Sequence, residues 1–387
     1  MSTACNVCHA PLAQTIYQSP ENHSITTMNT LVDGRTHVYF CDTCGHLQTS
    51  ELPNLAAYYA TEYSINANSE DDDQIYKVVE GQTIFRADHQ AAVLQAKLHF
   101  PEGCRVLDYG CAKAPTLRKL LAAHPGVEPY LFDVTDKYQP FWQRFPTPAK
   151  TAVGVPDPAW AGELDVVLSF YALEHVSDLD AAIGTIKRLL KVGGTFYFIV
   201  PNAYQNIADF VVADHINHFS ETSLRTLLER NGFDQVDVDA QAHDGAFVVS
   251  ARHSGRAVDG ALMPAPAELA ALRDKAWEMS QYWRDIVGRI RAFEADLPQG
   301  AAVAIYGAGF YANFIALSLQ DVGRVTAFVD QNPHLQGTTL YQRPVLAPVA
   351  LPVEVSHLLV GLNPRIARAN IEAIEAWRGR QLVFLYL

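Results

Sequence analysis

The chain has 387 residues, enough for two or three domains that each bury a core of their own. Apolar residues make up 49% and charged residues 18%, which excludes a disordered, collagenous or rod-like protein. There are 42 acidic residues against 29 Lys and Arg, a net charge of −13 that disfavours general nucleic-acid binding. The start of the chain has no leader-like pattern, and no apolar run reaches about 18 residues, so we expect a cytoplasmic protein without a membrane anchor.

Four of the six cysteines form two Cys-x-x-Cys pairs near the start of the chain. The paired residues are Cys5, Cys8, Cys41 and Cys44. Four thiolates make the closed tetrahedral set of a structural Zn²⁺ site, which we favour over chance pairing or a redox pair. No thiolate remains for an open catalytic position, so the metal is expected to be structural. We expect Cys104 and Cys111 to be ordinary core residues.

Strand and helix patterns alternate after the cysteine pairs. The acidic stretch 64–73 predicts a solvated connection, and the apolar spacing over 85–100 predicts a helix. Short apolar runs at 105–108, 130–132, 165–169 and 195–200 then predict strands, with helical patterns between them. Such an order is typical of a doubly wound, mostly parallel α/β sheet.

A second strand and helix unit follows near the C-terminus. The Pro-rich segment 263–266 precedes a long helical pattern over 267–293, which we expect to bridge two domains. Strands are predicted at 301–306 and 325–330. The chain therefore divides into a zinc-binding N-terminal domain, a central Rossmann-like domain and a bridging helix with a C-terminal Rossmann-like domain. The expected ranges are 1–72, 73–256 and 257–387.

The first of the two Rossmann-like units carries a nucleotide-binding pattern. Asp108 and Gly110 stand at the end of its first strand, where a glycine lets the backbone approach a ligand. Asp133 ends the next strand, 25 residues later, where an acid accepts hydrogen bonds from a ribose. NAD and S-adenosylmethionine (SAM) both place a ribose on such an acid. The alternative is a turn glycine with two helix-capping or solvated acids.

Later segments resemble class I SAM-dependent methyltransferases over about residues 80–255. The resemblance lies in the acid-x-Gly entry, the strand-end acid, the segment Leu173-Glu174-His175-Val176 and the turn Leu189–Gly194. It implies that Asp108 and Gly110 border the methionine part of SAM and that Ala112 also belongs to the cofactor-binding residues. It also implies that Asp133 holds the ribose and that Ser169 lies near the sulfonium. Ala112 and Ala114 stand where that family usually has glycine.

The whole chain is similar to the three-domain sugar C-methyltransferases. Shared features are the paired cysteine turns, Tyr63-Ser64, His243-Asp244-Gly245 and a Gly-Ala-rich C-terminal turn. The resemblance implies transfer of a methyl group from SAM to a carbon of a nucleotide-linked keto-deoxysugar. A carbon beside a ketone becomes nucleophilic only after proton removal, so a base with a pKa near neutrality is needed.

By that resemblance His215 is the first candidate for the base, and the neighbouring Asp214 is expected to orient its ring. His175 is a second candidate, as base or substrate ligand, and Tyr63 is a further polar contact. Asp214 stands where the family usually has Glu, and Val212 where it has Tyr. Because the chain has 14 histidines, an ordinary structural role is the alternative for each one.

The C-terminal unit has its own Gly-x-Gly turn, Gly307-Ala308-Gly309, with Asp330 ending the next strand. Alone it suggests NAD, but no catalytic residue set follows it. We expect it to shape a substrate cleft or only the fold. The other functions left open are an O- or N-methyltransferase of another small metabolite, an NAD-dependent oxidoreductase and a non-catalytic nucleotide-sugar binding protein.

Overall fold

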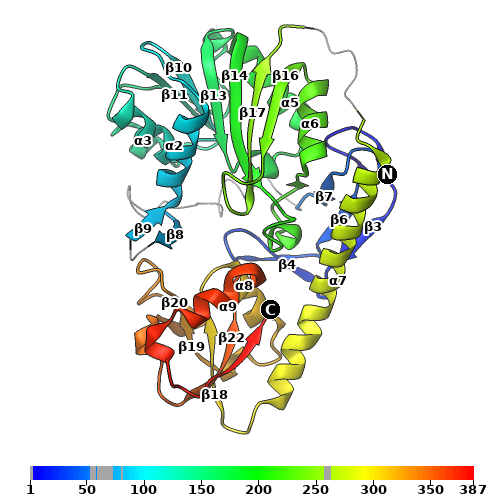
Figure 1. The fold of residues 1–387 in the computed structure, drawn as a ribbon, viewed down its shortest axis with the longest axis vertical. Coiled ribbons are helices and arrows are strands. Elements are labelled where there is room, and N and C mark those ends of the chain that lie inside the picture. Colours follow the sequence, from blue (N-terminus) through cyan, green and yellow to red (C-terminus); the bar gives the residue numbers. More distant parts are fainter. Residues whose placement is uncertain (1–2, 53–57, 59–72, 80–81, 257–262) are drawn as a thin grey trace. The chain divides into compact units, whose positions relative to one another are not determined.

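The computed structural model describes residues 3–52, 58, 73–79, 82–256 and 263–387 (Figure 1). Its described residues form two compact units. The first consists of 1–16, 37–209 and 213–276, and the second of 17–36, 210–212 and 277–387. The long helix predicted over 267–293 is confirmed as α7 (Pro266–Asp296), whose residues to 276 belong to the first unit and the rest to the second. Among the described residues, no helix has both the length and the apolar character that crossing a bilayer demands.

The first unit is built on a seven-stranded sheet in the order β12-β11-β10-β13-β14-β17-β16. Its strands are β10 (Arg105–Tyr109), β11 (Glu128–Asp133), β12 (Lys150–Val153), β13 (Leu164–Phe170), β14 (Leu190–Pro201), β16 (Phe233–Asp239) and β17 (Ala246–His253). The strands β10 to β14 pair in parallel, whereas β17 and β16 join antiparallel at one edge. The predicted doubly wound α/β sheet is therefore confirmed, with an antiparallel edge that the sequence did not reveal.

Helices cover both faces of this sheet. They are α2 (Arg86–Lys97), α3 (Pro115–Ala123), α4 (Gln139–Trp142), α5 (Leu179–Leu189) and α6 (Glu221–Arg230). Val106 and Leu168 pack with α2 and α3, while their chain neighbours Leu107 and Val167 pack with α5 and α6. Because alternate strand residues point to opposite faces, an apolar run without alternation is buried on both sides.

Short strands surround the paired cysteines. They are β1 (Thr3–Ala4), β2 (Pro11–Leu12), β3 (Thr15–Gln18), β6 (His37–Phe40), β7 (Leu47–Thr49) and β15 (Asn217–His218). The strands β15, β7, β6 and β3 form one sheet in that order, so a segment from between β14 and β16 of the central sheet pairs with the N-terminal region. Two hairpins complete the small strands: β4 (His23–Ile25) with β5 (Leu31–Asp33), and β8 (Ile75–Val79) with β9 (Gln82–Phe85).

The second unit has a six-stranded sheet in the order β20-β21-β19-β18-β22-β23. Its elements are β18 (Ala302–Tyr306), α8 (Phe310–Ser318), β19 (Val325–Val329), β20 (Thr339–Leu340), β21 (Arg343–Leu346), β22 (Val355–Val360), α9 (Pro364–Glu372) and β23 (Val383–Tyr386). The predicted strand, turn and helix around Gly307 are confirmed.

Candidate active site

The carboxyl ends of β10, β11 and β13 bring together the residues predicted to hold SAM. Asp108 lies in β10 and is 1% exposed. Its Oδ1 has no hydrogen-bond partner among the described residues, and burial raises the pKa of its carboxyl to about 8, with Asp133 adding to the rise. Gly110 has φ +72°, and a Cβ there would lie 2.9 Å from the Cβ of Ala172. The glycine thus lets the turn after β10 approach the loop that leaves β13.

Asp133, at the end of β11, is tied to the same turn. Its Oδ2 accepts a hydrogen bond from the Ala112 amide at 2.9 Å, and its Oδ1 accepts one from the Thr135 amide at 3.1 Å. Ala112 and Ala114 have φ of +45° and +53°, the left-handed region that costs a non-glycine residue about 1–2 kcal/mol. The turn keeps the backbone path expected of glycines although alanines occupy it.

These residues fit SAM in one respect that the geometry shows directly. The buried, unpartnered Asp108 oxygen is suited to an ammonium group such as that of the methionine part, because a buried carboxylate without a partner is costly. The Ser169 hydroxyl instead donates to the carbonyl of Tyr109 at 3.0 Å, so its proton is already used within the protein. Asp108 and Gly110 lie at the end of β10, Asp133 ends β11 and Ser169 lies in β13, which pairs with β10; that these residues hold SAM stays a prediction.

Two histidines lie face to edge beyond the end of β13. His175 ends the short 3₁₀ turn η2 (Leu173–His175), and His215 precedes β15. Their ring centroids are 4.7 Å apart at 83°. His175 Nδ1 lies 2.8 Å from the carbonyl oxygen of Asp214. Their side chains are 10% and 9% exposed, which leaves a small accessible edge on each ring.

A buried carboxylate, Asp209, holds His215. It lies in the 3₁₀ turn η3 (Asp209–Val211), and its Oδ1 is 2.5 Å from His215 Nδ1. Its Oδ2 is 2.8 Å from Nδ1 of His218, whose Nε2 is 2.7 Å from the Thr49 hydroxyl. Nothing in the sequence pattern of this loop marks Asp209, so its role was not predicted.

This arrangement differs from the predicted role of Asp214. Its side chain accepts a hydrogen bond from the Tyr58 hydroxyl at 3.2 Å, and its nearest carboxylate oxygen lies 3.8 Å from His175 Nδ1. The carboxylate that orients the His215 ring is Asp209. Tyr63 lies outside the described residues, and Val212 belongs to the second unit.

The surroundings separate the pKa values of the two histidines. Burial, aided by the charge of His215, lowers the pKa of His175 to about 4. Burial also opposes the charged form of His215, but the Asp209 carboxylate outweighs it and raises the pKa of His215 to about 9. The pKa of Asp209 is correspondingly held below its usual range despite burial. At neutral pH the pair therefore consists of a neutral His175 and a cationic His215.

The other histidine of the predicted family pattern, His243, lies in the loop before β17. Its Nε2 is 3.3 Å from the Tyr171 hydroxyl, and its ring meets those of Tyr76 and His89 at centroid distances of 4.7 and 5.2 Å. Arg86 lies 4.9 Å above the Tyr171 ring. Tyr171 thus packs in an aromatic wall with His243 and Arg86.

The four paired cysteines form one cluster. Their sulfur atoms lie within 4.8 Å of one another, with Cys5 and Cys44 3.7 Å apart and Cys8 and Cys41 3.4 Å apart. Tetrahedral Zn–S bonds of about 2.3 Å put sulfur atoms roughly 3.8 Å apart, so the cluster matches the predicted donor set. Cys104 and Cys111 are buried away from this cluster, as predicted.

The turn of the second unit repeats the local geometry of the first. Asp330 Oδ2 accepts a hydrogen bond from the Ala308 amide at 2.8 Å, and its Oδ1 accepts one from Asn332 at 2.8 Å. Gly307 has φ +100°, and a Cβ there would lie 2.5 Å from the carbonyl oxygen of Gly361. Both residues therefore have a role in shaping the turn.

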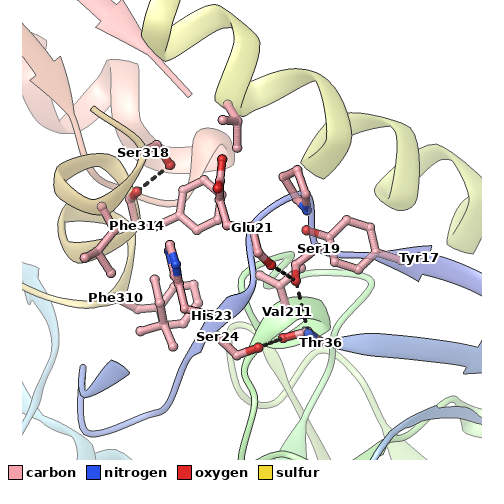
Figure 2. Close-up of a pocket in the computed structure, with 14 residues that line it drawn as sticks. Tyr17, Ser19, Glu21, His23, Ser24, Thr36, Val211, Phe310, Phe314 and Ser318 are labelled. Carbon is pink, nitrogen blue, oxygen red and sulfur yellow. Dashed lines mark hydrogen bonds between the residues drawn. The ribbon is translucent and has the colours of Figure 1, made fainter. Parts of the chain in front are cut away.

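Figure 2 shows a pocket in the second unit, lined by Tyr17, Phe310 and Phe314 among others. Three of its polar residues are paired with one another. The Thr36 hydroxyl donates to Ser24 at 2.7 Å, and the Thr36 amide donates to Ser19 at 3.1 Å. The pocket therefore presents an apolar wall, and these three residues direct no unpaired group toward a ligand.

Comparison with known proteins identifies the central region. Residues 84–238 match the family described as a methyltransferase domain, whereas no curated protein matches the chain. Solved structures with a similar fold include the citrinin polyketide synthase CMeT domain, at 17% identity and TM-score 0.37 over 43% of this chain. The match spans about half, 52%, of that protein.

Two further structures come from named bacteria. One is a SAM-dependent methyltransferase from Mesorhizobium loti, at 18% identity and TM-score 0.35, covering 42% of this chain and 97% of that one. The other is 1,6-didemethyltoxoflavin-N1-methyltransferase from Burkholderia thailandensis, at 22% identity and TM-score 0.34, covering 43% and 78%. The matched residues include Asp108 and Asp133 in the seven-stranded sheet, and His175 and His215 outside it. Over residues 84–238 the chain thus resembles a methyltransferase domain.

Proposed function

We propose that the chain methylates a carbon beside a ketone, with SAM as the methyl donor and a nucleotide-linked keto-deoxysugar as the acceptor. The observation that supports carbon methylation is the contact pair of His175 and His215 at the edge of the sheet that holds Asp108 and Asp133. Methylation of oxygen or nitrogen uses a lone pair already present, whereas methylation of carbon needs a base. The acceptor class is supported by the sequence resemblance.

In this proposal His175 is the base. Its pKa of about 4 is below the near-neutral value expected for the base, but it is the neutral member of the pair at pH 7, and we assign it the role of accepting the proton from the carbon beside the ketone. The cationic His215, held by Asp209, favours the negative charge that then develops on the ketone oxygen. SAM, when bound, supplies an electrophilic methyl group and leaves as S-adenosylhomocysteine.

The order of the two histidines is the reverse of the sequence expectation, which placed His215 first. A base must be unprotonated when the acceptor binds, and the Asp209 carboxylate favours the protonated form of His215. Asp209 takes the place of Asp214 as the residue that positions this ring.

We also propose that Cys5, Cys8, Cys41 and Cys44 hold a structural Zn²⁺. The support is the chemistry and spacing of the four sulfur atoms. The cluster adjoins β7, which pairs with β15 beside the histidines, so the ion would stabilise the segment that follows His215.

Proton exchange tests the proposal without methyl transfer. The protein is mixed with a nucleoside-diphosphate-linked keto-deoxyhexose in D₂O without SAM, and deuterium at the carbon beside the ketone is followed by NMR. We expect exchange in the wild type and its loss in His175→Gln, with the exposed His99→Gln as the matched control. Exchange that survives in His175→Gln and disappears in His215→Gln would assign the base to His215. A wild type that transfers a methyl group to oxygen or nitrogen without exchange would refute carbon methylation.

A further inference from the structure

Glu174 is a buried carboxylic acid that the mechanism above does not use. It precedes His175 in η2 and is 1% exposed. Its Oε2 has no hydrogen-bond partner among the described residues. An unpartnered buried oxygen is costly, commonly about 1–3 kcal/mol, so its presence beside a candidate active site needs an explanation.

The backbone around Glu174 is firmly held. Its carbonyl oxygen accepts a hydrogen bond from the Ile216 amide at 2.8 Å. The Asn217 side chain donates to the carbonyls of Leu173 and Val176 at 3.0 and 2.7 Å. The turn therefore keeps Glu174 next to the histidine pair, and the position of its carboxyl group is set by the fold.

A carboxylate oxygen of Glu174 and nitrogen atoms of His175 and His215 all lie within 4.8 Å of one another. The other ionisable groups acting on Glu174 are Asp209 and Arg86, and Tyr171 also senses its charge. Burial raises the pKa of Glu174 to about 8, although the His215 cation opposes the rise. Near neutral pH the group is therefore mainly a neutral acid, which can donate a hydrogen bond.

We propose that Glu174, in its protonated form, donates a hydrogen bond to the ketone oxygen of the acceptor and stabilises the enolate. This inference rests on the proposed function, and it adds a catalytic residue to it. The step is balanced within the site: the C–H electron pair becomes the C=C bond, the carbonyl π pair moves to oxygen, and His175 takes the proton. Glu174 keeps its own proton and shares it with that oxygen.

Glu174, His175 and His215 are also a donor set that could hold a divalent metal ion. A metal ion binds only neutral imidazole, so His215 would have to lose a proton before ligation. The 2.5 Å contact with Asp209 favours the protonated form instead. The hydrogen-bond donor role needs no such change. The hydrogen-bond donor role of Glu174 is therefore favoured, and metal binding is one of the outcomes that the test distinguishes.

The test compares two substitutions of Glu174 in the deuterium-exchange assay. Glu174→Gln keeps a neutral donor of similar shape, and we expect exchange within about tenfold of the wild type. Glu174→Leu removes the donor, and we expect a loss of about 10²- to 10³-fold, as for other oxyanion donors. Glu354→Leu, at an exposed site, is the matched control, and SAM binding by calorimetry checks that each variant is folded.

Infrared spectra give a readout that does not depend on the acceptor. Protonated carboxyl groups give a carbonyl stretch that shifts in D₂O, and at pH 6–7 the wild type is expected to show it for Glu174 as well as for Asp108. The part due to Glu174 is expected to be missing from Glu174→Gln. A band of equal intensity in the wild type and Glu174→Gln, or a loss of exchange as large in Glu174→Gln as in Glu174→Leu, overturns the inference. A second metal equivalent in the wild type that both variants lose overturns it in favour of a metal site. No exchange in the wild type instead refutes the proposed function.

Discussion

The Asp209→Asn substitution tests the charge arrangement of the site most directly. It keeps the shape of the side chain but removes the charge that faces His215 and His218 at 2.5 and 2.8 Å. The pKa of His215 rises from 6.5 to about 9 in the fold, and at 1.36 kcal/mol per pH unit this rise is worth about 3 kcal/mol. Breaking a buried ion pair by removing one partner costs about the same, roughly 3–5 kcal/mol.

The sign of the pH dependence follows from the raised pKa of His215. A group whose pKa is higher in the folded state contributes its full stability below its unfolded pKa of about 6.5 and loses it as the pH rises through about 9. The free energy of unfolding of Asp209→Asn should therefore fall below that of the wild type by about 3 kcal/mol at pH 6. The difference should shrink between pH 6.5 and 9.

Urea unfolding at a series of pH values measures this difference, and NMR titration of the histidine rings measures the pKa of His215. Asp237→Asn is the matched control, because Asp237 is an exposed partner of Lys97 and such pairs are worth only about 0–1 kcal/mol. A His215 ring that titrates near 6.5 in the wild type would refute the reasoning. A stability loss that does not change with pH would do so as well.

Three other predictions concern the cofactor, the metal and the pH profile. Asp133→Ala should weaken SAM binding by about 1.5–3 kcal/mol in calorimetry, whereas Asp330→Ala should leave SAM binding intact. Loss of SAM binding in Asp330→Ala would show that SAM binds the second unit instead of the first. One Zn per chain is expected by metal analysis, and Cys41→Ser should lower zinc content and yield; a stable variant with stoichiometric zinc would contradict this. The deuterium-exchange rate should rise through about pH 4 as His175 loses its proton, and it should fall near pH 8–9 as Glu174 and His215 lose theirs. An exchange rate that rises steadily up to pH 9 would indicate His215 as the base.

Local patterns predicted most of the fold. The apolar runs around Leu107, Val167 and Phe198 gave strands because each is buried on both faces of one sheet. Most of the turn predicted at Leu189–Gly194 is instead part of β14, which starts at Leu190 and pairs with β13 through a register shift after Leu164. Gly193 has φ +82° there, so the glycines mark an irregular strand rather than its beginning.

The charge arrangement of the site could not be predicted, because it depends on contacts that sequence spacing does not report. Asp214 and His215 are neighbours in sequence, yet the carboxylate against the His215 ring comes from Asp209, six residues earlier in a loop without periodicity. The pKa order of the histidines depends on that contact. A sequence motif can therefore show that the base is a histidine without indicating which of two histidine rings carries the proton.

The same contacts explain why the N-terminal region belongs to the site. Asp209 has two carboxylate oxygens, and one of them faces His218, whose other nitrogen is 2.7 Å from the Thr49 hydroxyl. Thr49 lies in β7, and β7 pairs with β15, the strand that contains His218. The Asp209 carboxylate contacts the rings of both His215 and His218. A substitution of Thr49 removes the hydrogen-bond partner of His218 Nε2 and so changes the hydrogen bond between His218 Nδ1 and Asp209. The cysteine region and the histidine pair are thereby connected through hydrogen bonds, and a substitution that loosens β7 should affect proton transfer without touching the acceptor.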